Sequence, residues 1–202
     1  WLATFTSSIT YESDGNVWFI APNGTICSGK PAAADSLAAG AIPTWTTYAP
    51  PAGFKPSSLV VTRERVLYCA GRWEQSSRSV VLRTPLRSPP QWTVLEVPCL
   101  GQLYDLDAQS DGTVWVTGER REVFHLVADH WVKELTPLPY HNFQLRIFDQ
   151  GTGWIVAETR DLSAVYHRSG GQWSLAYRGS GAFLLVHAEP GLAYVLTSEG
   201  VL

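Results

Sequence analysis

The sequence Ser13-Asp14-Gly15-Asn16-Val17-Trp18 returns almost unchanged as Ser110-Asp111-Gly112-Thr113-Val114-Trp115, and this repeat is the main sequence evidence for the fold class. A weaker copy runs from Asp149 to Trp154. Asp-Gly before an alternating apolar stretch is a strong hairpin signal, because Gly readily takes the positive φ angle that tight turns need. The three copies therefore predict that one hairpin unit recurs along the chain.

Tryptophans mark a second recurring strand. Five short strand-like segments begin with Trp, at intervals of 44, 47, 39 and 42 residues, at Trp1, Trp45, Trp92, Trp131 and Trp173. A period near 42 residues is the size of one four-stranded propeller blade. We predict an all-β propeller of about five four-stranded blades in a single domain over residues 1–202. The expected blades cover residues 8–48, 57–97, 102–135, 142–178 and 182–202.

Two segments fall outside this pattern. The last blade lacks an outer strand, while residues 1–6 resemble one, so we expect residues 1–6 to pair with the last blade and close the ring. The alternative is that the chain is part of a propeller with six to eight blades. The Ala-rich residues 31–40 predict either one or two helical turns or a loop, because Pro stands at their start and Gly at their end.

The Asp-Gly-x-Val-Trp motifs and the Trp in each blade resemble the Trp-rich bacterial propeller repeats of sensor kinases, assembly factors and sialidase-like proteins. The segment from Asp14 to Ile20 is also similar to repeats of streptogramin lyase propellers. The resemblance covers nearly the whole chain and implies the propeller fold. It implies no catalytic residue, because the His and Glu pattern of the lyases has no counterpart here and the Asp-boxes of sialidases are only partly matched.

Composition narrows the classes of partner. The net charge is −3 and only 16% of residues are charged, which gives no electrostatic case for nucleic acid or an anionic membrane. The longest apolar runs are far shorter than the ~20 residues of a spanning helix, so we expect no membrane insertion. Cys27, Cys69 and Cys99 are an odd number and provide no disulfide framework. The chain begins at Trp1 without any Met, so we expect the natural start to lie upstream; the compartment is not indicated.

Catalytic motifs are absent from the sequence. It contains no nucleophile elbow, zinc-protease motif, phosphate-binding loop or dinucleotide fingerprint, so we expect no cofactor and no resident metal. Asp105 and Asp107 lie two residues apart on an expected innermost strand, so both side chains should project to one face, toward the central channel. Paired carboxylates are what glycoside hydrolysis requires, although such acids more often bind backbone amides, water or a cation.

The expected loops between the second and third strands of each blade contain five of the twelve arginines. All these loops should emerge at one rim of the ring, where binding residues gather on a rigid scaffold. The candidate binding residues there are Arg72, Trp73, Arg78, Arg120, Arg121 and Arg160, with Tyr140 and His141 on a neighbouring connection. Arg and Trp are favoured interface anchors. We therefore expect a non-catalytic scaffold that recognises a protein partner; the alternative is a lectin or glycosidase-like propeller that binds a glycan.

Overall fold

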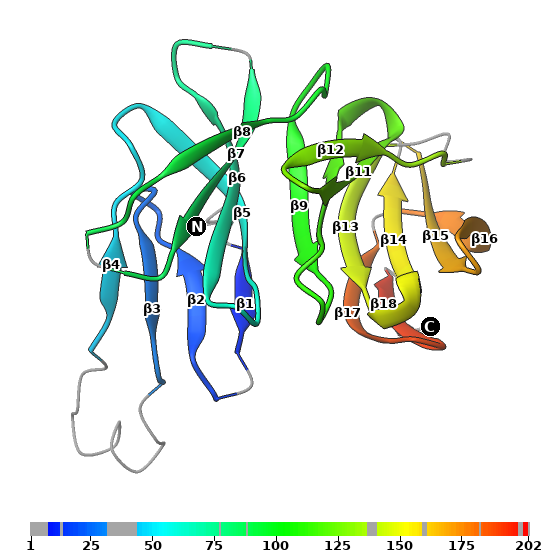
Figure 1. The fold of residues 1–202 in the computed structure, drawn as a ribbon. Helices are drawn as coiled ribbons and strands as arrows, with labels where there is room; N and C mark the ends of the chain where they lie inside the picture. Colours follow the sequence, from blue (N-terminus) through cyan, green and yellow to red (C-terminus); the bar gives the residue numbers. More distant parts are fainter. Residues whose placement is uncertain are drawn as a thin grey trace.

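The computed structural model describes residues 8–12, 14–31, 44–76, 78–87, 89–136, 141–158, 161–181, 183–197 and 200–201. These residues form five antiparallel sheets arranged around a common axis, as expected for a propeller (Figure 1). Within each sheet the strands follow one another in chain order, so each sheet is one blade. The first four blades have four strands, and the described part of the fifth has three.

Each blade takes its strands from one continuous stretch of chain. The first blade consists of β1 (Ile9–Tyr11), β2 (Val17–Ile20), β3 (Ile26–Gly29) and β4 (Thr46–Tyr48). The second consists of β5 (Phe54–Val61), β6 (Val66–Trp73), β7 (Ser79–Pro85) and β8 (Thr93–Glu96). The third consists of β9 (Leu103–Ala108), β10 (Val114–Gly118), β11 (Glu122–Val127) and β12 (His130–Lys133). The fourth consists of β13 (His141–Ile147), β14 (Gly153–Glu158), β15 (Leu162–Ser169) and β16 (Gln172–Ser180). The fifth consists of β17 (Leu184–Glu189), β18 (Leu192–Thr197) and β19 (Gly200–Val201).

The Asp-Gly repeats form the turns between the first two strands of a blade, which confirms the expectation from sequence. The side chains of Asp14 and Asp111 each accept a hydrogen bond from the backbone amide two residues ahead, at 2.9 and 2.8 Å. The glycines that follow, Gly15 and Gly112, have φ angles of 83° and 88°. These angles lie in the left-handed region that only Gly adopts without strain, so the motif fixes the turn.

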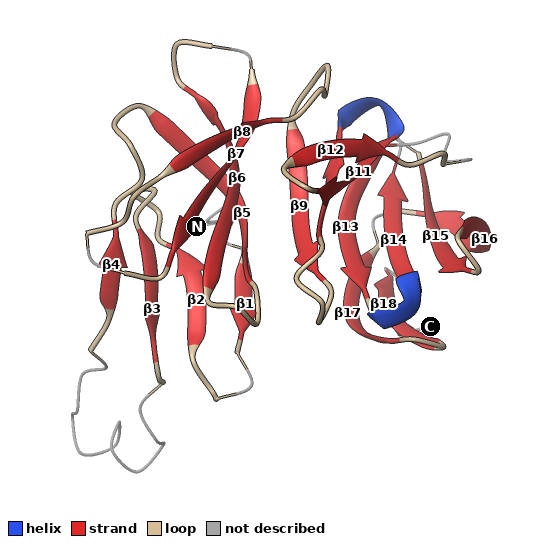
Figure 2. Cartoon of the chain, in the orientation of Figure 1, coloured by secondary structure: helices blue, strands red, loops and turns tan. Residues whose placement is uncertain are grey.

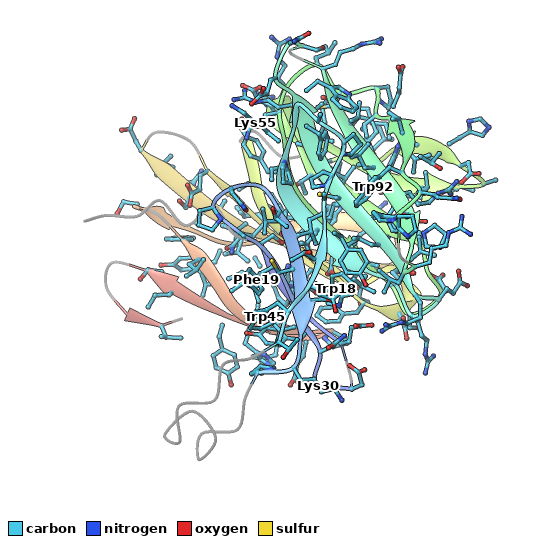
Figure 3. The ribbon with its side chains drawn as sticks, turned by 90° about the vertical axis from the view of Figure 1, so that its left-hand side faces the viewer. Trp18, Phe19, Lys30, Trp45, Lys55 and Trp92 are labelled. Carbon is cyan, nitrogen blue, oxygen red and sulfur yellow. The ribbon has the colours of Figure 1, made fainter. Side chains whose placement is uncertain are left out.

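The Trp that ends each full motif anchors its own turn. Trp18 and Trp115 are almost completely buried, and each indole N–H donates to the residue six positions earlier. The acceptors are Glu12 at 2.7 Å and Gln109 at 3.3 Å. The ring thus fills the space between blades while its single polar atom remains paired, as a buried indole requires. In Figure 3, Trp18 points to one side of the first sheet, while Phe19 and Trp45 lie on the other.

Apolar side chains fill the spaces between successive blades. One cluster between the first and second blades includes Trp18, Ile26, Leu59 and Leu67, each no more than 1% exposed. Comparable clusters lie between the second and third, third and fourth, and fourth and fifth blades. Burial of one such side chain stabilises the fold by about 1.5–3 kcal/mol, so the blades hold one another in place.

A repeated hydrogen bond also connects the innermost strands. At equivalent positions, a polar side chain of one blade accepts the backbone N–H of the next blade's innermost strand. The four pairs are Ser8 with Leu59 (3.3 Å), Ser58 with Leu106 (3.1 Å), Asp105 with Leu145 (3.0 Å) and Gln144 with Leu185 (2.6 Å). The equivalent residue of the fifth blade is Leu184, which has no side-chain acceptor. The series therefore ends at that blade.

The structure differs from the sequence predictions mainly at strand ends. Strand β5 begins at Phe54, three residues before the expected start of the second blade at residue 57, and a register shift between Pro56 and Ser58 accommodates the proline. All three cysteines are free thiols. The expected closing strand at residues 1–6 lies outside the described residues, as do residues 32–40 of the Ala-rich segment 31–40 in which helical turns were one expectation. No helix in the described part of the chain is long and apolar enough to cross a membrane.

Candidate functional site

One end of the propeller axis gathers the loops that the sequence singles out. The β6–β7 loop and the 3₁₀ turn η1 (Glu119–Arg121), which joins β10 to β11, lie at the upper end of the molecule in Figure 2. The second 3₁₀ turn, η2 (Asp149–Gly151), lies at the lower end. We call the upper end, with the β6–β7 loop and η1, the arginine end. Lys55, near the start of β5, also lies at this end (Figure 3).

A cavity of about 510 Å³ opens at the arginine end, between the innermost strands of several blades. Its polar wall comes from the beginnings of β5 and β9, from the middle and the end of β13 and from the end of β6. The residues that define its chemistry are Lys55, Arg72, Tyr104, Asp105, Gln144 and Arg146. Ser8 and Ile9 of the first blade complete the lining, so the site is assembled by packing of the first four blades.

The cavity wall is positively charged, although the chain as a whole carries a net charge of −3. Three of the lining residues, Lys55, Arg72 and Arg146, are cations, whereas Asp105 is the one carboxylate among them. Lys55 forms an exposed ion pair with Glu74 at 3.3 Å. Exposed pairs of this kind contribute about 0–1 kcal/mol, so Lys55 can exchange Glu74 for another anion at little cost.

Asp105 is fully engaged in holding the blades together. Its Oδ1 accepts from the Ser58 hydroxyl at 2.9 Å and from the Leu106 amide at 3.0 Å. Its Oδ2 accepts from the Leu145 amide at 3.0 Å and lies 3.4 Å from Nη1 of Arg146. Burial raises the pKa of Asp105, and Arg146 and these hydrogen bonds oppose that rise. The carboxylate thus joins three consecutive blades.

Asp107 occupies a similar position one step further along the axis. It accepts the backbone N–H of Ile147 at 2.7 Å, again across the boundary between the third and fourth blades. Burial raises its pKa to about 6. The prediction that Asp105 and Asp107 form a channel site remains a prediction, and the partners observed for both are structural.

The structure disperses the predicted rim residues over several environments. Arg72 is exposed and lines the cavity. Trp73 is half-buried and packs edge-on against Phe54, with ring centroids 5.4 Å apart. Arg78 is exposed and forms an ion pair with Glu96 at 3.3 Å. Of this set, Arg72 therefore reaches the cavity directly, whereas Trp73 contributes mainly to packing.

Arg120 and Arg121 lie in η1 at the same end, and both are exposed. Their φ angles are 62° and 70°, in the left-handed region that non-Gly residues seldom adopt. Such backbone strain is often found at functional sites. Tyr140 and Arg160 lie outside the described residues. The backbone of His141 begins β13, but its side chain also lies outside them.

Sequence reasoning missed four residues of the cavity: Lys55, Tyr104, Gln144 and Arg146. Burial raises the pKa of Tyr104, so its hydroxyl is a neutral donor at physiological pH. A signal was present in the polar-aliphatic dipeptides Ser8-Ile9, Ser58-Leu59, Asp105-Leu106 and Gln144-Leu145. These mark one position of the innermost strands, and the polar residues at that position line the cavity.

The described residues contain no group of three His, Cys, Asp or Glu side chains that could hold a metal ion. A second cavity of about 610 Å³ lies at the opposite end of the axis and includes Arg63, Gln109 and Asp149. Asp149 there accepts from the hydroxyl and amide of Ser110, which lowers its pKa. The charged residues that line this cavity are one cation, Arg63, and one carboxylate, Asp149. It therefore lacks the excess of cations found at the arginine end.

Comparison with known proteins identifies structural neighbours without close sequence relatives. No family model matches the chain, and no curated protein matches it in sequence. A protein of unknown function from Bacteroides caccae has a TM-score of 0.60 at 12% identity, over 94% of this chain and 69% of its own. YCF48 bound to a D1 peptide has a TM-score of 0.57 at 12% identity, over 94% and 59%. A gluconolactonase-like protein has a TM-score of 0.62 at 13% identity, over 96% and 72%.

This chain therefore spans between 59% and 72% of the lengths of these three solved structures. A luciferin-regenerating enzyme also matches, with a TM-score of 0.62 at 12% identity. At these identities the likeness shows the fold alone, because one fold supports many functions. The chain is a β-propeller whose structural neighbours include both a peptide-bound protein and enzyme-like proteins.

Proposed function

We propose that the protein is a non-catalytic binding propeller that recognises a protein partner with its arginine end. The observation that carries this proposal is the cation-lined cavity on a chain whose overall charge is negative. A concentration of cations on a rigid scaffold attracts and orients an oppositely charged partner more than it stabilises the fold. The exposed Arg120 and Arg121 of η1 extend the positive surface beyond the cavity.

Two further observations support binding over catalysis. The four acceptor positions of Asp105 are occupied by donors of its own chain, which leaves this carboxylate poorly suited to proton transfer. YCF48, a structural neighbour, is bound to a peptide. No observation in the described residues favours the glycan-binding alternative.

Affinity purification from the source organism, followed by mass spectrometry, tests this proposal. The wild-type chain should retain a specific partner, and the double variant Arg120→Glu, Arg121→Glu should retain much less of it because the surface charge is reversed. The matched control is Arg63→Glu at the opposite end, which should retain the partner as the wild type does. Thermal unfolding of all three proteins should be nearly the same. Equal partner recovery by the wild type and the double variant would refute the proposal.

A further inference from the structure

Arg146 is held at the cavity wall in a way that leaves part of its guanidinium available. In the described part of the chain, its hydrogen bonds all use Nη1, which donates to the Leu145 carbonyl at 2.6 Å and lies 3.4 Å from Asp105 Oδ2. The side chain remains 43% exposed. Its Nη2 and Nε atoms are therefore donors that the wall does not use. Because the side chain is already anchored, a ligand would lose little conformational entropy in ordering it.

The surroundings of Arg146 favour a small anionic group. Arg72 lines the same cavity, and no ion pair among the described residues engages it. Each oxygen of Asp105 already has two hydrogen-bond partners. Asp105 therefore has no unused acceptor position for the remaining N–H groups of Arg146. The Tyr104 hydroxyl and the Gln144 amide add neutral polar groups to the same wall. A planar anion that enters would thus meet two guanidinium groups.

A carboxylate suits this cavity better than other anions. Guanidinium donors match the two oxygens of a carboxylate, and such charge-assisted pairs are strong where water is partly excluded. The wall has three cations and one carboxylate, so its positive charge matches a ligand with one or two negative charges. A nucleic acid backbone would instead need an extended basic surface, which an acidic chain of this kind does not provide.

We propose that the cavity is a carboxylate-binding site that takes an Asp or Glu side chain of the protein partner, with Arg146 and Arg72 as its two guanidinium contacts. This inference rests on the proposed function and specifies the chemistry that it recognises. Arg120 and Arg121 lie outside the cavity and would contact the surface around the inserted side chain.

Fluorescence anisotropy with defined peptides tests the site directly. The probe is a fluorescein-labelled decapeptide in which Asp alternates with Gly and Ser, and the matched probe has Asn at every Asp position. The Asp peptide should bind at least tenfold more tightly than the Asn peptide. Arg146→Gln and Arg72→Gln should each weaken binding of the Asp peptide about 10- to 100-fold, the range expected for one lost charge-assisted contact. Arg63→Gln, at the opposite end, should bind as the wild type does.

Several outcomes would overturn the site. Equal binding of the Asp and Asn peptides would do so, as would unchanged binding by both cavity variants with intact circular dichroism spectra. Displacement of the Asp peptide by inorganic phosphate, but not by acetate at equal ionic strength, would show a phosphate site instead. If the cavity variants still recover the partner from the source organism fully, the carboxylate site fails while the proposed function stands. If the Asp peptide binds through Arg146 but no protein partner is recovered, the proposed function fails while the site stands.

Discussion

Replacement of Asp105 by Ala tests whether this acid is structural. The change removes three hydrogen bonds that Asp105 accepts, from the Ser58 hydroxyl and from the Leu106 and Leu145 amides in the innermost strands of three blades. The Leu106 amide keeps a second acceptor, the Ser58 hydroxyl at 3.1 Å. A typical hydrogen bond contributes about 0.5–1.5 kcal/mol, so three lost bonds cost about 3 kcal/mol. Donors left buried without a partner add to this cost. Removal of a buried charge, whose burial already raises its pKa, gives part of it back.

We therefore expect Asp105→Ala to lower the free energy of unfolding by about 2–4 kcal/mol. For a chain of this size, 1 kcal/mol corresponds to a shift of about 2–4 °C in the melting temperature, so the midpoint should fall by about 4–16 °C. Thermal unfolding followed by far-ultraviolet circular dichroism measures the shift. Asp105→Asn keeps one carbonyl oxygen as an acceptor and should lose less than Asp105→Ala.

The control for this experiment is Glu96→Ala. The Glu96 side chain is 68% exposed and forms an ion pair with Arg78 at 3.3 Å. Pairs as exposed as this one contribute about 0–1 kcal/mol, so the control should melt close to the wild type. If Asp105→Ala melts no lower than Glu96→Ala, the carboxylate does not hold the blades together. Its place in the central channel would then need a functional explanation.

Two further predictions concern pH and backbone conformation. Burial raises the pKa of Asp107 in the folded protein to about 6, above its ordinary value of 3.8, so the folded state binds the proton more tightly than the unfolded state. The free energy of unfolding should therefore fall by about 2–3 kcal/mol as the pH rises from about 4 to about 6.5. Asp107→Asn should flatten this part of a melting-temperature profile, and a variant profile parallel to that of the wild type would contradict the assignment. Gly112→Ala should lower the free energy of unfolding by about 1–2 kcal/mol, because φ at this residue is 88°. The control is Gly191→Ala, where a Cβ would meet no neighbour within 4 Å, and it should melt nearly as the wild type does. Equal melting temperatures of the two variants would argue against strain at the turn.

The strands were readable from sequence because each blade is a local unit. The third blade takes all four of its strands from residues 103–133, and the fourth takes its strands from residues 141–180. Turn chemistry and alternation act over a few residues, so they are visible in a single sequence. The start of β5 was missed because Pro56 is atypical inside a strand, and there a register shift keeps the pairing continuous past it.

The candidate site could be predicted only in part, because its residues come from segments far apart in the sequence. Arg72 was found because it stands at the end of a strand, next to a loop of known type. Lys55, Gln144 and Arg146 come from innermost strands, where the local pattern suggests only alternation between faces. Their meeting point depends on how three blades align, which is set by contacts between residues about 40 or more positions apart. No short sequence window contains that information.

The same residues hold the propeller together and shape its cavity, and this limits how the site can change. Ser58, Asp105 and Gln144 line the cavity and also accept hydrogen bonds from the next blade. A substitution at any of them alters the joints between blades, so it costs stability as well as binding. The guanidinium group of Arg72 is exposed and contributes charge without joining the blades. Arg146 is partly exposed, but it also lies 3.4 Å from the buried Asp105 carboxylate and is therefore tied to this framework. Recognition can thus be retuned most freely at Arg72, whereas Arg146 and the polar residues behind it are constrained by the fold.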